Sequence, residues 1–160
     1  IVEFPGVLYR GGDEKKIRQY LIQHNHVDCV IQLPANLFFG VGIATCIIVL
    51  KKSAKVDSSV LFIDASKLFV KDGNKNLLLD EHLDKIMELY AHRKDVDYLA
   101  KLVKNDDILA NDCNLSVSSY VEQEDTREVI DIKEVNAKLE KLIAEGNELN
   151  KKIEAIIKEM

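Results

Sequence analysis

Long apolar runs and paired cysteines are both missing from this sequence of 160 residues. No apolar run approaches the roughly 20 residues that a membrane-spanning helix needs, so we expect no membrane insertion. The three cysteines, Cys29, Cys46 and Cys113, lack CxxC spacing, and their odd number without a secretory signal predicts reduced thiols in a cytoplasmic protein. The N-terminus has no basic region followed by an apolar core, so it does not resemble a signal peptide.

An excess of positive charge is missing as well. The chain has 22 Lys and Arg against 27 Asp and Glu, which gives a formal net charge of −5. A protein that binds nucleic acid over a broad surface has the opposite balance, so any such contact must be local or supplied by a partner. Hydrophobic residues at 47% and charged residues at 31% indicate a globular protein, and the length fits one domain, or a small domain with an appended helical element.

The first half of the chain alternates between strand and helix patterns. Residues 1–4 are expected to end a buried strand, and apolar spacing predicts a helix over 13–24. The short apolar run 27–33 is typical of a strand covered on both faces, and strand, helix and strand in this order favour a parallel sheet. The runs 45–50 and 60–64, joined by the charged segment KKSAKVDSS, predict an antiparallel hairpin.

The loop between the second and third strand patterns holds the most informative residues. Phe38 and Phe39 stand where turn chemistry predicts exposed backbone, which is an unfavourable place for aromatic surface. Either the loop meets something flat, such as a nucleobase, or one or both rings pack under a neighbouring segment. Pro34 and Asn36 would fix the path of the loop, and Gly42 would permit a close approach.

The second half begins with a turn signal at 71–75, KDGNK. A helix is expected over 80–93, with Asp80 as its cap and an apolar face on one side. The acidic residues and the histidine at its start are better explained by capping than by metal binding, and we expect no metal. A short strand near 102–103 and a helical turn from Asp106 should follow.

The last 30 residues form a long amphipathic helix pattern. Asp131 and Glu134 resemble a capping box, and Gly146 stands at the one seam position that lacks an apolar side chain. Three–four spacing over four heptads is typical of a coiled coil, and a single helix of this length is marginal in water without a partner. The apolar seam residues are Ile132, Val135, Leu139, Leu142, Leu149, Ile153, Ile156 and Met160.

Several segments taken in order resemble one family. The segment LPANLFFGVGIATCIIVLKK, preceded by GVLYRGGDEKKIRQYLI and followed by VLFIDAS, is similar to the modification (methyltransferase) subunit of type I restriction–modification systems. NLSVSSYV is near the family pattern of an Asn-Leu followed by Arg-Tyr-Val, with Ser119 where arginine is usual. The resemblance implies N6-adenine methylation of DNA with S-adenosylmethionine, and it covers nearly the whole chain.

The family also has motifs that this sequence lacks. Its cofactor-binding glycine loop and its Asn-Pro-Pro-aromatic motif lie upstream of the segments matched here. The two prolines of this chain, Pro5 and Pro34, follow neither an Asn nor another Pro. We therefore expect a C-terminal fragment that does not catalyse alone, binds no cofactor alone, and provides no catalytic residue. The full-length enzyme would use S-adenosylmethionine.

The resemblance also implies which residues lie near DNA. An enzyme that acts on adenine extrudes the base from the duplex, and the family places the loop after the second strand beside that base. Apart from the resemblance, exposed amides at the start of the first helix could bind a phosphate. The residues expected beside the target base are Pro34, Asn36, Phe38, Phe39, Gly42, Leu50, Lys51 and Lys52. The residues expected at a phosphate are Arg10, Gly11 and Gly12.

The expected fold is α/β, the C-terminal part of a Rossmann-like S-adenosylmethionine-dependent methyltransferase sheet with a helical end. Residues 1–70 would complete the catalytic domain, 71–130 would form a helical or irregular extension, and 131–160 a coiled-coil helix. That helix is the expected docking element for the DNA-specificity subunit, in a complex that also contains the restriction subunit and DNA, with self-association as a further use.

Two other functions compete with this interpretation. In the first, the chain is a non-enzymatic interaction protein whose terminal helix self-associates on a Rossmann-like remnant. In the second, it is a nucleotide-binding α/β module, which would need a phosphate-binding glycine fingerprint that the sequence lacks. An Asn-Pro-Pro-aromatic motif encoded upstream of Ile1 would favour the enzyme over the interaction protein.

Overall fold

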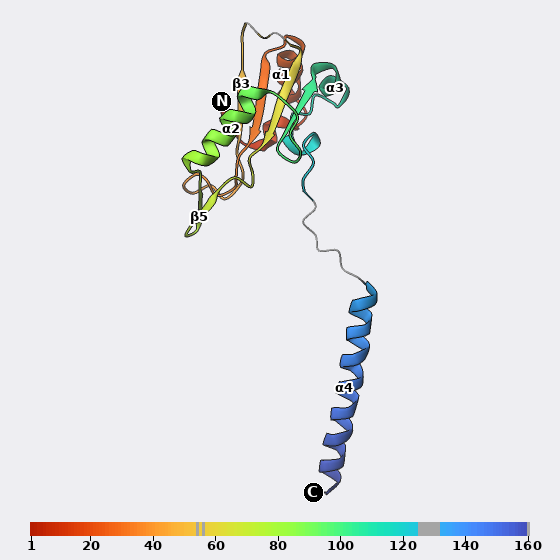
Figure 1. Ribbon diagram of the computed structural model, residues 1–160. Helices are drawn as coiled ribbons and strands as arrows, with labels where there is room; N and C mark the ends of the chain where they lie inside the picture. The colour runs from red at the N-terminus through yellow and green to blue at the C-terminus, as the bar shows by residue number, and fades with distance from the viewer. Residues whose placement is uncertain (54, 56, 125–131, 160) are drawn as a thin grey trace. The chain divides into compact units, whose positions relative to one another are not determined.

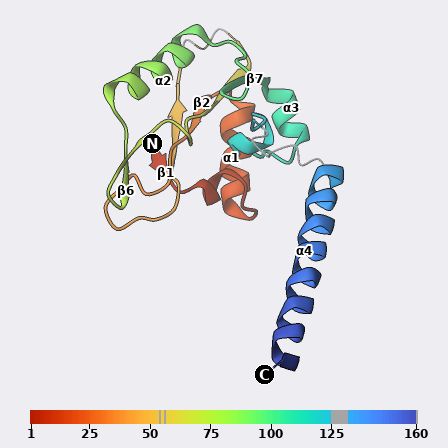
Figure 2. The ribbon, with the colours of Figure 1, turned by 60° about the horizontal axis from the view of Figure 1, so that its bottom comes forward.

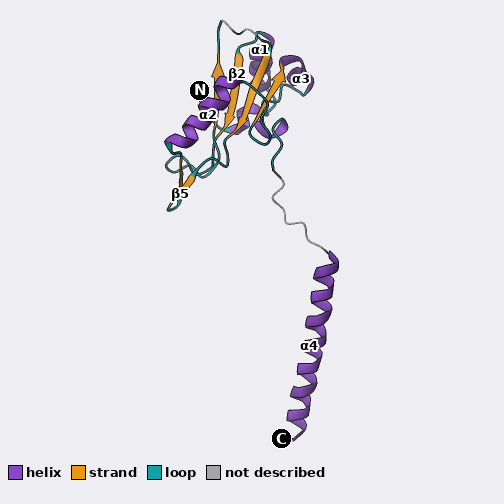
Figure 3. Ribbon diagram, in the orientation of Figure 1, coloured by secondary structure: helices purple, strands orange, loops and turns teal. Residues whose placement is uncertain are grey.

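Figure 1 shows the computed structural model, which describes residues 1–53, 55, 57–124 and 132–159. The chain divides into two compact units, residues 1–124 and residues 125–160. The first unit mixes helices and strands, and the second contains the single helix α4, Ile132–Glu159 (Figure 3). Across these described ranges we find no helix with the length and apolar character that crossing a bilayer requires.

A five-stranded mixed sheet forms the centre of the first unit. Its strands are β1 (Val2–Glu3), β2 (Val27–Gln32), β3 (Cys46–Leu50), β4 (Ser59–Asp64) and β7 (Ala100–Lys104). Their order across the sheet is β1-β3-β2-β4-β7. β3 lies antiparallel between β1 and β2, β4 is parallel to β2, and β7 is antiparallel to β4. β1 and β2 therefore run in the same direction, separated by β3.

Helices cover both faces of this sheet. They are α1 (Asp13–Gln23), α2 (Asp80–His92), α3 (Asn105–Ala110) and two short 3-10 helices at Pro5–Leu8 and Val117–Ser119. Figures 1 and 2 show α2 on one side of the strands, and α1 with α3 on the other. The predicted helices at 13–24 and 80–93 are confirmed, as are the strand near 102–103 and the helical turn after Lys104.

Alternation along the central strands creates two apolar cores. Val60 and Phe62 of β4 pack with the α1 and α3 side, whereas Leu61 and Ile63 pack with the α2 side. Successive strand residues point to opposite faces, so an apolar run of this kind is buried on both. β2 is also buried on both faces, as its continuous apolar pattern predicts.

The three cysteines belong to these cores. All three are buried and unpaired. Burial raises the pKa of Cys29 to about 12 and that of Cys46 to about 11, which keeps both thiols protonated at neutral pH. They act as small apolar side chains.

Three expectations from the sequence are wrong. The runs 45–50 and 60–64 do not form a hairpin, because β3 pairs with β1 and β2 while β4 lies on the other side of β2. β1 is exposed rather than buried, since it is an edge strand with one neighbour among the described residues. Asp80 is the first residue of α2 and not its cap; the amide of Leu79 instead donates to Nδ1 of His82, 3.1 Å away.

The predicted turn at 71–75 forms a separate small hairpin. Its strands are β5 (Val70–Asp72) and β6 (Lys75–Leu77), which pair antiparallel. Gly73 has a φ of 59°, a left-handed conformation that glycine adopts at little cost. The predicted capping residue Asp131 and the last seam residue Met160 lie outside the described residues.

A buried carboxylate fixes the end of α2 to the sheet. The side chain of Asp28, at a bulge in β2, is 1% exposed. It accepts a hydrogen bond of 2.7 Å from the Tyr90 hydroxyl, and it pairs with Lys51 and Arg93, each at 3.0 Å. Arg93, in a left-handed conformation just after α2, also donates to the carbonyl of Ser59. These bonds join α2, β2 and the start of β4.

The ion pairs of Asp28 determine its titration. Burial acts to raise its pKa, but hydrogen bonds from Tyr90 and Lys51 and the charge of Arg93 outweigh burial and hold that pKa below its ordinary value of 3.8. A carboxylate with a depressed pKa stabilises the fold above pH about 4, and this stabilisation is lost as the pH falls through the folded-state pKa.

Replacing Asp28 with Asn should lower the free energy of unfolding at pH 7 by about 2–3 kcal/mol, because two cations lose a buried counter-charge. Urea unfolding between pH 3 and pH 7 measures this loss, and the difference between variant and wild type should shrink towards pH 3. Glu88→Gln, which removes an exposed pair with Lys85 on the same helix α2, is the matched control. An Asp28→Asn protein as stable as the control at pH 7 would contradict the assignment.

Candidate functional site

The parallel strands β1, β2 and β4 end at one edge of the sheet, which we call the carboxyl edge. β3 begins at the same edge, because Gln32 pairs with Cys46. The connection between β2 and β3, residues 33–45, therefore stays at the carboxyl edge, and we call it the aromatic loop. Its base is closed by the amide of Leu33, which donates to the carbonyl of Thr45 over 2.9 Å. Ligands of open α/β sheets bind beyond the carboxyl ends of the strands.

Two left-handed residues shape the aromatic loop. Asn36 has a φ of 54° and Gly40 a φ of 73°, and the amide of Val41 donates to the carbonyl of Phe38 over 3.1 Å. Pro34 is buried at the start of the loop. A Cβ added at Gly42 would lie 3.5 Å from the side-chain oxygen of Asn36, so these two positions are in contact. The predicted loop residues thus come together in one turn.

Neither ring of the aromatic loop is buried. Phe39 is 88% exposed, and Phe38 is 43% exposed. Phe38 lines a hollow of about 210 Å³ together with Phe4, Val41 and others. Of the two alternatives that the sequence left open, burial under a neighbouring segment does not apply to Phe39, whereas Phe38 is partly packed. Exposed aromatic rings at this edge can stack on a planar ligand.

An apolar groove begins beside Phe38. It encloses about 660 Å³ on the α2 face of the sheet. Sheet residues such as Ile31 and Ile47 form its floor, and α2 residues such as Leu83 and Met87 form one wall. Among the described residues, none with a charged side chain lines it, so its contacts are mainly apolar.

Leu50, Lys51 and Lys52 lie at the opposite edge of the sheet. Leu50 pairs with Val27 at the start of β2, and the amide of Lys51 donates to the carbonyl of His26 over 2.8 Å. Four residue steps of about 3.3 Å each, roughly 13 Å in all, separate Leu50 from the start of β3. The structure therefore does not bring these three residues together with the aromatic loop. The ammonium of Lys51 instead pairs with Asp28.

Arg10, Gly11 and Gly12 precede α1. Because β1 leads into α1 and α1 returns to the start of β2, this end of the helix belongs to the carboxyl edge. Gly12 has a φ of 71° and no side chain caps the helix. Two acidic residues, Asp13 and Glu14, occupy the first turn and already complement its positive end.

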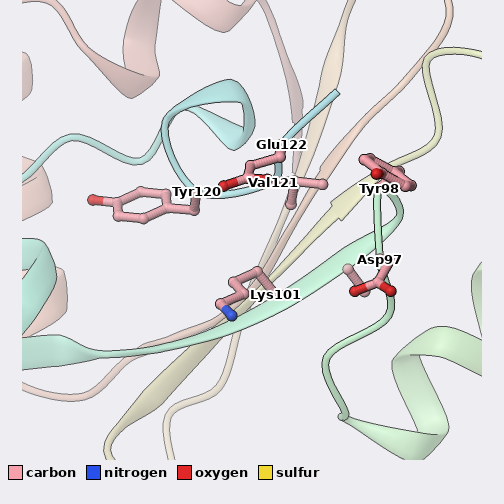
Figure 4. A pocket seen from close by; sticks show the side chains of 7 residues that line it. Asp97, Tyr98, Lys101, Tyr120, Val121 and Glu122 are labelled. Atoms are coloured by element: carbon pink, nitrogen blue, oxygen red, sulfur yellow. The ribbon is translucent and has the colours of Figure 1, made fainter. Parts of the chain in front are cut away.

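A polar hollow that we did not predict lies along β7, the outermost strand on the side of the sheet away from β1. It encloses about 340 Å³, and Figure 4 shows Lys101 of β7 with Tyr98 and Asp97 on one side and Tyr120 to Glu122 on the other. Lys101 pairs with Asp95 at 2.7 Å. The one sequence signal was the NLSVSSYV segment, which ends at this hollow. Within the described residues, no three His, Cys, Asp or Glu side chains gather as metal ligands.

The apolar seam of α4 is exposed where its side chains are described. Leu139, Leu142, Leu149 and Ile153 each expose more than half of their surface. The seam positions Ile132, Val135 and Ile156 belong to the helix, but their side chains lie outside the described set. A Cβ at Gly146 would meet nothing within 4 Å.

Comparison with known proteins is consistent with this fold. The sequence profile of the N-6 DNA methylase family matches residues 1–129. The methylase subunit of type I restriction enzyme MpnII from Mycoplasma pneumoniae is 40% identical over the whole chain, and that of MjaVIII from Methanocaldococcus jannaschii is 35% identical over 98% of it. The chain spans only 30% and 27% of the lengths of these two relatives.

A solved structure agrees with these relatives. The methyltransferase subunit of a type I restriction–modification system from Streptococcus thermophilus superposes with a TM-score of 0.74 at 44% identity, over 76% of this chain and 26% of that one. It shares the mixed α/β architecture. The profile match covers well over half of the sequence, and the chain therefore belongs to the N-6 DNA methylase family.

Proposed function

We propose that the chain is the C-terminal part of an adenine-N6 DNA methylase subunit of a type I restriction–modification system. Residues 1–70 complete its Rossmann-like catalytic sheet, 71–130 extend it, and 131–160 dock a partner. The observation that carries this proposal is the aromatic loop, which holds Phe39 88% exposed at the carboxyl edge. The insertion of β3 antiparallel between two parallel strands also supports the methyltransferase-like sheet.

The aromatic loop contacts the extruded adenine in this proposal. A flipped base is held by stacking between aromatic side chains and by edge contacts. Phe39 offers an open ring for stacking, and Phe38 borders the same edge from its partly packed position. Pro34, Asn36 and Gly42 set the backbone path that presents the rings. A purely structural role, in which buried rings anchor the loop, does not account for the exposure of Phe39.

Other predicted residues receive different roles. Arg10, with the amides of Gly11 and Gly12, would contact a DNA phosphate at the same edge, although two neighbouring carboxylates weaken the attraction. Leu50, Lys51 and Lys52 would support the opposite edge of the sheet, where β2 and β4 start and which we call the amino edge, rather than the base, since Lys51 already pairs with Asp28.

S-adenosylmethionine is the cofactor of the complete enzyme in this proposal. The described residues do not fit it by themselves. The groove of about 660 Å³ could cover an apolar ring, yet its lining has no carboxylate for ribose hydroxyls or for the amino group of the methionine part. The cofactor site and the catalytic group would come from other parts of the enzyme. We propose no cofactor binding and no methyl transfer by this chain alone.

Helix α4 is the docking element in this proposal. Its exposed Leu139, Leu142, Leu149 and Ile153 follow coiled-coil spacing, and such a stripe is stable in water only when another helix covers it. The partner is the DNA-specificity subunit, within an assembly that includes the restriction subunit and DNA. The non-enzymatic alternative, self-association of a small interaction protein, is not favoured by the family match to residues 1–129.

Replacing Phe39 with Ala in the complete methylase subunit should lower kcat/KM for adenine methylation by about 10- to 100-fold, because base–aromatic stacking contributes about 1–3 kcal/mol per base. Transfer of a labelled methyl group to target DNA measures this loss. Phe39→Trp, which keeps a stacking ring, should retain most activity. Tyr20→Ala removes another exposed ring, from α1, and serves as the control. Equal activity of the Phe39→Ala and Tyr20→Ala enzymes would refute the base contact.

Removal of residues 132–160 should abolish co-purification of the complete subunit with its specificity subunit, and a Leu142→Glu, Leu149→Glu double variant should do the same. The first unit should remain folded, because both of its cores are formed by residues of 1–124. Lys141→Ala changes an exposed polar position and should co-purify normally. Continued co-purification of the truncated subunit would exclude α4 as the docking element. Light scattering of the isolated chain over a concentration series tests self-association separately.

A further inference from the structure

The β5–β6 hairpin lies against the aromatic loop, although residues 46–69 lie between them in the sequence. Figures 1 and 2 both show this hairpin beside the connection between β2 and β3. The hairpin is not part of the five-stranded sheet, and it pairs only with itself among the described strands. Its contacts with the loop therefore call for an explanation other than completing a sheet.

Two neighbouring residues of β6 make these contacts. The side-chain amide of Asn76 donates to the carbonyl of Ala35 over 2.7 Å, and its backbone amide donates to the carbonyl of Asn36 over 3.0 Å. The ammonium of Lys75 lies 4.4 Å from the centroid of the Phe39 ring. Asn76 thus holds the backbone before the two phenylalanines, and Lys75 contacts the ring of Phe39.

The exposure of Phe39 shows what this arrangement leaves free. With an ammonium over one face of the ring, Phe39 as a residue is still 88% exposed, so the opposite face is open. A cation over the face of an aromatic ring is attracted by its quadrupole. A loop that must stack on an incoming ligand binds it more tightly when its conformation is already fixed, because less ordering is required on binding.

We propose that Lys75 and Asn76 are positioning residues, and that the β5–β6 hairpin braces the aromatic loop so that the open face of Phe39 meets the extruded adenine. This inference rests on the proposed function and adds a second element to the site. Asn76 acts through the backbone of residues 35–36, and Lys75 acts through the ring. Neither touches the reacting atoms.

The first test uses this chain alone and measures amide hydrogen exchange in residues 36–42. Asn76→Leu keeps the size of the side chain but cannot donate, and it should speed exchange in the loop by about tenfold, the worth of one hydrogen bond. Lys75→Met should have a smaller effect, about threefold. Because this variant alters no backbone contact, it still tests the brace if Asn76→Leu folds poorly. The matched controls are Asn74→Leu and Lys71→Met on the same hairpin, which should exchange like wild type. Unchanged exchange in both test variants would overturn the brace.

The second test uses the complete methylase assembled with its specificity subunit, and DNA with 2-aminopurine at the target adenine. Stacking on Phe39 should quench the extruded probe, so Lys75→Met and Asn76→Leu should each brighten it about two- to threefold. Both should lower kcat several-fold with little change in KM for DNA, and Lys75→Arg should restore the wild-type values because arginine keeps the cation over the ring.

The outcomes separate the two hypotheses. Faster exchange in the loop with wild-type fluorescence and kcat would overturn the positioning role while leaving the proposed function intact. Wild-type methylation by Phe39→Ala would refute the base contact itself, and the positioning role with it. Faster exchange, brighter probe and lower kcat in both test variants, with normal controls, would support the brace.

Discussion

The antiparallel insertion of β3 between β1 and β2 determines where each part of the first unit lies. Because β2 and β3 are consecutive and antiparallel, their connection must remain at one edge of the sheet. β3 then ends at the other edge, where β4 starts, so β4 must run parallel to β2. The aromatic loop is thereby fixed at the carboxyl edge, and the charged connection after β3 at the amino edge.

These two edges carry different physical properties. At the amino edge, the buried Asp28 accepts a hydrogen bond from Tyr90 and pairs with Lys51 and Arg93. These interactions attach α2 to the sheet. At the carboxyl edge, Phe39 remains exposed in a loop that another hairpin holds. An exposed ring is unfavourable for solubility and folding, and a protein tolerates such local inconsistency mainly at functional positions when the rest of the fold is well determined.

Local patterns explain which features could be predicted from the sequence. The spacing of α1 and α2 and the apolar run of β2 are each readable within a dozen residues, and all three elements were found. The partner of a strand is a non-local property, so the hairpin predicted between the runs that form β3 and β4 is wrong. The hydrogen bond from Asn76 to Ala35 and the contact of Lys75 with the Phe39 ring are non-local as well, so no local sequence pattern indicates them.

The chain also exposes apolar surface in two physically different ways. On α4, Leu139, Leu142 and Leu149 recur at heptad spacing, which suits a long partner helix that buries the whole stripe. In the aromatic loop the exposed apolar residues are Phe38, Phe39 and Ile43, and the two rings suit a small planar ligand. A lone helix of 28 residues depends on its partner for stability, whereas the loop is held by bonds within its own unit. Assembly of a complex would therefore order the first surface, and leave the second already formed for its ligand.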